Sequence, residues 1–256
     1  MPRGIFTRMV LKRRFSLVLT ALLAVLSLTA MFPSVALADN GPMGSNTAGW
    51  DISWPQCGAP PPEQRPTMFH VVGVTGGKPY TSNPCLGAQF GYAAAAGPLS
   101  LYVNLDFGLA IDAGPLTCQP GDQGCEAYNY GWGAGVSAWS SARRETNGSQ
   151  NVKVWWLDVE TENVWSDVTD LNTYVIQGAL DFLQVTEGRT VGIYSTSFQW
   201  HEIAGDFVPP NTPNWIAGAS SLDDTAQCQN PLWKGGTVWA FQYLNPDVDL
   251  DQDRGC

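Results

Sequence analysis

Short runs of apolar, β-branched and aromatic residues recur along the chain from residue 48 onward, and most of them end in small or polar residues. Such runs are typical of buried strands, because these side chains suit a pleated, half-buried surface. The pattern predicts eight strands, at residues 48–53, 69–75, 99–107, 152–161, 190–195, 214–218, 237–243 and 248–250.

Helical patterns fill several intervals between the predicted strands. The clearest covers residues 170–187, where an apolar stripe at helical spacing is followed by Gly188. Small residues predict a helix over 86–96 that stops at Gly97-Pro98. Aromatic and small residues predict a third over 126–145, although three glycines in it lower its helix propensity.

The alternation of strands with helices or long loops continues from residue 48 to residue 256 without an internal boundary. This order favours either a parallel barrel or an open parallel sheet. Polar residues recur at the strand exits, which favours the barrel, since the active face of such a barrel is built from those ends. We therefore expect one α/β barrel domain over residues 48–256.

Two acids end the fourth predicted strand, which reads VKVWWLDVET over 152–161. Side chains alternate along a strand, so Asp158 and Glu160 share one face. Their Cα atoms would lie about 6.6 to 7 Å apart. Carboxylate pairs that act on one glycosidic bond are separated by ~5 to 9.5 Å. The alternative is a strand that merely runs into a polar loop, and the pair alone does not decide between the two.

The first 38 residues have the pattern of a removable signal peptide. A basic region precedes an almost wholly apolar stretch at 15–32, and residues 36–38 fit the small-x-small cleavage rule. Cleavage before Asp39 would leave residues 39–47 as a flexible start. The Arg13-Arg14 pair raises the twin-arginine route, but the residues after it favour ordinary secretion. We expect a secreted protein, extracellular or associated with the cell wall, with no membrane contact after signal removal.

The net negative charge of the chain limits the kinds of partner that it can bind. The net charge of the whole chain is −10, and loss of the signal peptide, which carries five cations and no acids, lowers it to −15. This charge disfavours nucleic acid as a partner. The 218 residues that remain after cleavage suit a single domain with a sizeable core, and we expect a monomer.

Six cysteines in an exported chain indicate disulfides. Fifteen pairings are formally possible. Proximity in sequence and loop position favour three local pairs, namely Cys57–Cys85, Cys118–Cys125 and Cys228–Cys256.

Seven segments, taken in order, carry a resemblance to a known family. They are GWDIS at 49–53, FHVVGVT at 69–75, WLDVE at 156–160, GIYS at 192–195, NWIA at 214–217, WAFQY at 239–243 and VDLD at 248–251. As a set they resemble the glycoside hydrolase family 25 lysozymes, and also secreted actinobacterial proteins described only as glycoside-hydrolase-like. The resemblance implies a modified TIM-like (β/α) barrel with an acid-lined groove that cleaves peptidoglycan between N-acetylmuramic acid and N-acetylglucosamine, without a cofactor.

The resemblance also implies roles for individual residues. Glu160 would be the general acid, and Asp158 would orient the 2-acetamido group of the substrate or stabilise the developing cation. Asp51 and Asp249 would complete the acidic ring. Neighbouring carboxylates would raise the pKa of Glu160 and so keep it protonated near neutral pH. The further candidates for sugar contacts are Gln242, Tyr194, Trp215, Trp239 and Tyr102, and for each aromatic residue core packing is the alternative.

Two departures from the family pattern leave two function classes open. Thr75-Gly76-Gly77 stands where the lysozymes usually read Thr-Glu-Gly, and Tyr102-Val103-Asn104 stands where they usually carry Tyr-His. The chain is therefore interpreted either as a glycosidase acting on cell-wall glycan or as an inactive glycan-binding or structural cell-envelope module on the same barrel.

The sequence lacks the motifs of metallopeptidases and serine hydrolases. The two histidines, His70 and His201, belong to no HExxH motif, and no GxSxG motif is present. We expect His70 to be a structural residue with satisfied hydrogen bonds. The acidic tail begins like a calcium loop, but Gln252 replaces the required glycine, so no metal site is expected.

Overall fold

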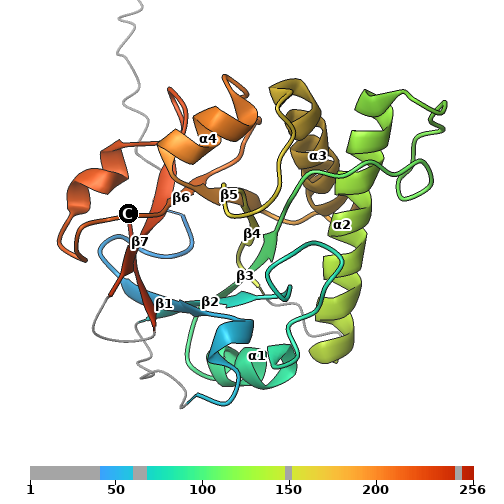
Figure 1. Cartoon of the computed structure of the whole chain (residues 1–256). Helices are drawn as coiled ribbons and strands as arrows, with labels where there is room; N and C mark the ends of the chain where they lie inside the picture. Colours follow the sequence, from blue (N-terminus) through green and yellow to red (C-terminus); the bar gives the residue numbers. More distant parts are fainter. Residues whose placement is uncertain (1–40, 60–67, 148–151, 246–249) are drawn as a thin grey trace, which may run out of the picture. The chain divides into compact units, whose positions relative to one another are not determined.

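The computed structural model describes residues 41–59, 68–147, 152–245 and 250–256 (Figure 1). The predicted signal peptide and Asp249 lie outside this part of the chain. Within it, strands close into a barrel in sequence order. They are β1 (Ala48–Ile52), β2 (Phe69–Gly73), β3 (Leu99–Asn104), β4 (Trp155–Asp158), β5 (Val191–Ser195), β6 (Asn214–Ile216), β7 (Val238–Leu244) and β8 (Asp251–Gly255). The predicted α/β barrel is thus confirmed.

The last strand differs from the prediction in place and direction. Strands β1 to β7 are parallel to their sequence neighbours, whereas β8 is antiparallel to both β7 and β1. A short connection joins β7 to β8, and a parallel pairing would need a crossover of a dozen or more residues. The strand expected at 248–250 lies largely outside the described residues, which place the closing strand at Asp251–Gly255. The expected all-parallel barrel was wrong at this strand.

Three predicted helices are present, and a fourth was not foreseen. They are α1 (Leu86–Ala94), α2 (Gln123–Glu145), α3 (Thr169–Asp181) and the unforeseen α4 (Ser197–Ala204). Short turns of helix lie at η1 (Trp54–Gln56), η2 (Phe182–Thr186, which extends α3) and η3 (Thr225–Gln229). Helix α4 begins where the Thr196 hydroxyl accepts a hydrogen bond from the backbone N–H of Gln199 at 3.0 Å, an N-cap that fixes so short a helix.

Helices α2 and α3 lie side by side along one flank of the barrel (Figure 1). A Cβ on Gly131 would lie 1.8 Å from the carbonyl oxygen of Val175, and one on Gly178 would lie 2.1 Å from that of Tyr128. Glycine is therefore required where the two backbones meet. Gly131, which lowers the helix propensity of 126–145, is what allows this helix to pack closely.

Alternation along the strands fills the barrel interior with large and small side chains that face one another. Trp156 lies against Gly192, where an added Cβ would come within 2.2 Å of the indole ring, and Phe69 lies against Gly49, where the gap would be 2.7 Å. The interior apolar cluster comprises Met43, Phe69, Val71, Val154, Trp156, Tyr194, Trp215 and Ala240. This packed layer forms a solid base beneath the polar end of the barrel.

Residues 41–47 are anchored, in contrast to the flexible start expected for 39–47. Met43 is only 3% exposed and belongs to the interior cluster. The backbone N–H of Asn46 donates to the carbonyl of Gly255 at 2.9 Å, and the N–H of Gly255 donates to that of Thr47 at 2.8 Å. Sequence composition indicated a polar, glycine-rich stretch but not this pairing with β8.

All three predicted disulfides are confirmed. Cys57–Cys85 ties η1 to the start of α1, Cys118–Cys125 ties the loop after β3 to α2, and Cys228–Cys256 ties η3 to the end of β8. Each closed loop contributes roughly 2 to 4 kcal/mol in the chain-entropy model. In the described residues we find no helix with the length and apolarity needed to cross a bilayer.

Candidate active site

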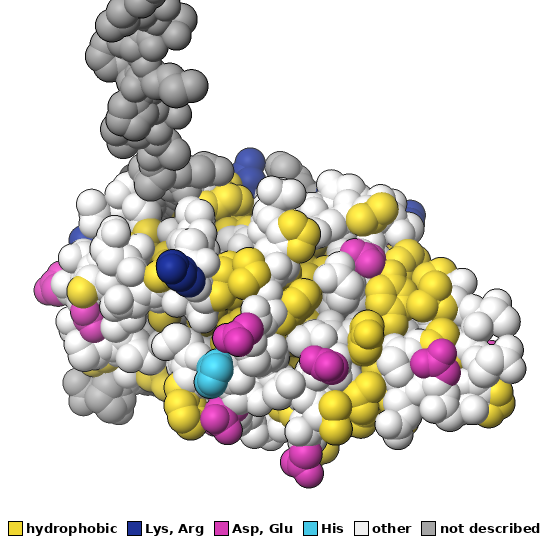
Figure 2. Space-filling view, turned by 90° about the horizontal axis from the view of Figure 1, so that it is seen from above, with side chains coloured by type: hydrophobic (Ala, Val, Ile, Leu, Met, Phe, Trp, Pro, Cys, Tyr) yellow, Lys and Arg dark blue, Asp and Glu magenta, His cyan; other side chains and the backbone are white. Residues whose placement is uncertain are grey.

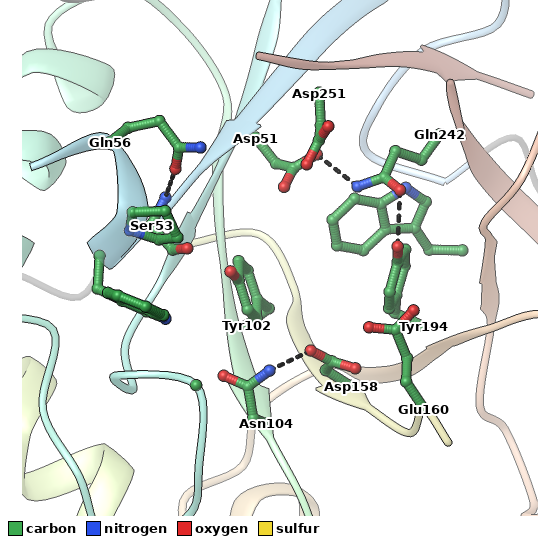
Figure 3. Close-up of a pocket in the computed structure, with 14 residues that line it drawn as sticks. Asp51, Ser53, Gln56, Tyr102, Asn104, Asp158, Glu160, Tyr194, Gln242 and Asp251 are labelled. Carbon is green, nitrogen blue, oxygen red and sulfur yellow. Dashed lines mark hydrogen bonds between the residues drawn. The ribbon is translucent and has the colours of Figure 1, made fainter. Parts of the chain in front are cut away.

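A polar pocket of about 220 Å³ opens where the parallel strands end (Figure 3). Such strand ends carry the active sites of barrel enzymes, because side chains from many strands converge there. The lining residues are Asp51, Ser53, Trp54, Pro55, Gln56, Gly77, Tyr102, Asn104, Asp158, Glu160, Tyr194, Trp215, Gln242 and Asp251.

Most of the residues selected from the sequence meet in this pocket. Those brought together are Asp51, Asp158, Glu160, Tyr102, Tyr194, Trp215 and Gln242. Trp239 does not line it. It lies in a separate groove beside residues 208–213, because the alternation that turns Gln242 inward places Trp239 on the opposite face of β7.

The acid that β8 contributes is Asp251, two positions beyond the predicted Asp249. Asp249 itself lies outside the described residues. Asp253, a further two positions along, is completely buried beneath the pocket. The sequence carries acids at 247, 249, 251 and 253, which would all share one strand face, so alternation alone could not show that Asp251 reaches the pocket.

Asp158 and Glu160 form a hydrogen-bonded pair. Strand β4 ends at Asp158, which is 4% exposed, and Glu160 follows in the more accessible segment beyond it. The carboxyl group of Asp158 donates to Glu160. Asn104 donates to Oδ2 of Asp158, and the Thr75 hydroxyl donates to Oδ1 of Asn104 at 2.5 Å. The pair is thus held from β3 by a side chain that the sequence analysis noted only as a departure.

The pocket raises the pKa of both members of this pair. Burial and the negative charge of Glu162 raise the pKa of Glu160 to about 7, against the hydrogen bond from Asp158. Burial and the charge of Glu160 raise the pKa of Asp158 well above its usual range. Because the two carboxyls interact strongly, they titrate as a pair that retains a proton near neutral pH.

A second hydrogen-bonded chain crosses the other side of the pocket (Figure 3). The Tyr194 hydroxyl donates to Oε1 of Gln242 at 2.6 Å, and Nε2 of Gln242 donates to Oδ2 of Asp51 at 2.8 Å. Burial and the charge of Asp251 raise the pKa of Asp51 to about 8, although the bond from Gln242 opposes the shift. Gln242 therefore joins an acid on β1 to a phenol on β5.

The rim of the pocket is built from η1, which the sequence analysis missed. Trp54 is 47% exposed there, and a Cβ on Gly77 would lie 3.1 Å from its Nε1. Ser53 and Gln56 fix the turn, since the backbone N–H of Ser53 donates to Oε1 of Gln56 at 2.9 Å. A half-exposed indole at a polar pocket offers an apolar face to a ligand.

The chemistry of the pocket is that of carboxyl, amide and aromatic groups. No Lys, Arg or His is among the described residues that line it. The described part of the chain also holds no cluster of His, Cys, Asp or Glu suited to a metal ion. In Figure 2 acidic side chains are scattered among apolar and uncharged ones over the face shown. The arrangement can transfer protons to oxygen atoms and donate hydrogen bonds to a neutral, hydroxyl-rich ligand.

Comparison with solved structures identifies the architecture. The bacterial lysozyme from Streptomyces coelicolor matches with a TM-score of 0.56 and 17% identity, over 82% of this chain and 92% of that one. The barrel has the fold of the family 25 lysozymes. A family 25 glycosyl hydrolase from Bacillus anthracis matches with a TM-score of 0.54 and 12% identity, over 82% of this chain and 89% of that one.

A muramidase shares this lysozyme fold. The muramidase from Acremonium alcalophilum matches with a TM-score of 0.53 and 17% identity, over 82% of this chain and 93% of that one. Neither a sequence-family model nor a curated protein sequence matches the chain. At such identities the likeness extends to the fold, so the argument for function depends on the site residues.

Proposed function

We propose that this protein is a secreted glycosidase that hydrolyses cell-wall glycan, with lysozyme-like cleavage of peptidoglycan as the reaction. The observation that carries the proposal is the pair Asp158 and Glu160, hydrogen-bonded at the mouth of a barrel whose fold is shared with lysozymes and muramidases. The predicted signal peptide and the three disulfides support an extracellular site of action.

Glu160 is the group suited to supply the proton. Its pKa of about 7 leaves it largely protonated in mildly acidic solution, and it is the more accessible member of the pair. As the glycosidic C–O bond breaks, the Glu160 proton passes to the leaving oxygen. Water then adds to the anomeric carbon and returns a proton to Glu160, so that the atoms and charges balance.

Asp158 is suited to stabilise the sugar that bears the developing positive charge. Asn104 and Thr75 fix its carboxyl group in one orientation. Once Glu160 has given its proton to the leaving group, the Glu160 carboxylate can accept a hydrogen bond from the protonated Asp158. An oriented carboxyl group can bind the 2-acetamido group or face the cationic centre. Asp51, Gln242 and Tyr194 provide hydrogen-bonding groups on the opposite wall.

A glycan-binding module without turnover is the second candidate. The observation in its favour is that Gly76, where the lysozymes usually carry Glu, adds no carboxyl group next to Gly77 of the pocket wall. The backbone N–H of Gly76 instead donates to the Thr81 hydroxyl at 2.9 Å, within its own loop. Such a site would still offer a groove for glycan binding, but with one acidic residue fewer than the lysozymes usually have.

Release of reducing ends by purified residues 39–256 distinguishes the two candidates. Peptidoglycan, chitin and simple β-glucans are incubated with the wild type and with Glu160→Gln, which serves as the matched inactive variant. The glycosidase proposal predicts release from peptidoglycan by the wild type alone. Binding of peptidoglycan to wild type and variant alike, with no release by either, would replace the enzyme with the binding module.

A further inference from the structure

Asp253 is a buried acid that the proposed reaction does not use. It lies on β8, where it pairs with Gln242 of β7 on one side and with Gly49 of β1 on the other. Its exposure is 0%. Oδ1 accepts a hydrogen bond from Nε1 of Trp215 at 2.9 Å, whereas no N–H or hydroxyl donor of the described residues reaches Oδ2.

If Asp253 were ionised, its negative charge would be poorly stabilised by the groups around it. Among the described residues, one neutral indole N–H is its only conventional donor. Burial of a charge costs several kcal/mol unless the charge is well paired. The neighbour that the Asp253 carboxyl meets is Asp51, which lies diagonally across the β1–β8 pair. Two carboxyl groups in contact share a proton rather than ionise together.

The other titratable groups around Asp253 and its partner Asp51 supply no positive charge. Asp251 on β8 acts on both Asp253 and Asp51, and Asp158 and Glu160 at the end of β4 interact with Asp51. The phenols Tyr102 on β3 and Tyr194 on β5 are neutral, because burial and the nearby carboxylates raise their pKa well above its usual value. Since the described pocket lining provides no cation, these carboxyls cannot all be ionised. Asp253 is the most deeply buried acid of the set, and burial together with the charge of Asp51 raises its pKa well above the usual range.

We propose that Asp253 is a positioning residue that remains a neutral carboxylic acid, in which Oδ2–H donates to Asp51 while Oδ1 accepts from Trp215. Asp51 and Trp215 both line the pocket, so Asp253 fixes an acid and an aromatic wall from beneath without touching the substrate. Together with Gln242, it gives Asp51 two hydrogen-bond donors. The effect on turnover rests on the proposed function, but the protonation state of Asp253 does not.

The protonation state is measured directly by carboxyl ¹³C NMR of protein labelled at the Asp side chains. Asp253→Asn identifies the resonance of Asp253 by its loss, and Asp112→Asn, on the exposed loop after β3, serves as the control. The expected result is a resonance that keeps the shift of a neutral acid at pH 7. A resonance that titrates below pH 5, as an ordinary aspartate does, would overturn the proposal even if the protein hydrolyses no glycan.

Two substitutions test the positioning role. Asp253→Asn retains one donor for Asp51 and one acceptor for Trp215, so it should hydrolyse peptidoglycan within about threefold of wild type. Asp253→Leu removes both groups and should lower kcat by roughly 10 to 100-fold, since small misplacements of site groups have effects of that size. Equal rates for Asp253→Leu and wild type would contradict the role. If Asp253→Leu fails to fold, the NMR titration of the wild type still decides whether Asp253 is neutral.

Discussion

The buried carboxyl group of Asp158 keeps its proton beside the more accessible carboxyl group of Glu160, whose own proton is lost near pH 7. This arrangement lets the accessible residue act as proton donor while the buried one keeps its orientation. The two residues should therefore fail in different ways when each is made into its amide.

Glu160→Gln should lower kcat/KM on peptidoglycan by roughly 10² to 10⁴-fold, the usual contribution of a general acid. With an aryl glycoside whose leaving group barely needs a proton, most of that loss should disappear. Asp158→Asn should remain slow on both substrates, because stabilisation of the cationic transition state is still missing. Equal defects of Glu160→Gln on the two substrates would remove Glu160 from the acid role.

The pKa of Glu160, about 7, predicts an alkaline limit to activity. A general acid works in its protonated form, so kcat/KM should fall tenfold for each pH unit above about 7. The charge of Glu162 helps to raise this pKa. Glu162→Gln should therefore move the alkaline limb to lower pH, while Glu187→Gln, at the far end of η2, should leave it unchanged. An unmoved limb in Glu162→Gln would count against Glu160 as the titrating acid.

The burial of His70 predicts that the protein loses stability in acid. Contrary to the expectation of a satisfied structural residue, it is completely buried on β2 and stacks on Trp50 at 4.3 Å. Neither of its ring nitrogens makes a hydrogen bond of good geometry to any described residue. Burial lowers its pKa to about 4. As the pH falls below about 6.5 the unfolded chain binds the proton first, so His70 should remove up to about 3 kcal/mol of stability by pH 4.

Urea unfolding at pH 7 and pH 4.5 measures this effect. His70→Phe keeps an aromatic ring beside Trp50 and should lose less stability than wild type between the two values. The exposed His201, replaced by Gln, is the matched control and should follow wild type. The explanation fails if His70→Phe loses as much stability on acidification as wild type does.

Two glycine substitutions should have opposite effects on stability, because Gly178 lies at the contact between α2 and α3 whereas Gly91 lies in open space on α1. Gly178→Ala would place a methyl group 2.1 Å from the Tyr128 carbonyl oxygen, so the helices must separate, at a cost of about 2 to 4 kcal/mol. Gly91→Ala on α1 meets nothing within 4 Å and should stabilise by about 0.5 to 1 kcal/mol. The free energy of unfolding in urea distinguishes them, and a neutral Gly178→Ala would show that the helices are not in contact there.

The sequence was sufficient for features that depend on local pattern. The strand that carries Asp158 and Glu160 is predictable because a run of large apolar residues ends in two acids on one face. Local spacing likewise identified the three disulfides. The same alternation that turns Gln242 inward could also have excluded Trp239, which lies outside the pocket.

Features that depend on pairing between strands could not be predicted. Asn104 reaches Asp158 because the two residues stand opposite each other in the β3–β4 register, which no local pattern specifies. The position of Asp251 in the pocket has the same origin, since a shift of two residues preserves the face. The exposure of Trp54 depends on the η1 turn, which Ser53 and Gln56 close.

The direct pairing of β1 with β8 also governs when the site comes into being during folding. Gln242 and Asp51 are 191 residues apart in sequence, yet their hydrogen bond lies at the seam that closes the barrel. A contact of such sequence separation forms late, because the entropy of a long loop must be lost before the contact contributes any stability. The two walls of the pocket therefore remain separate in any partly folded chain, and refolding should restore helical circular dichroism before it restores glycan binding.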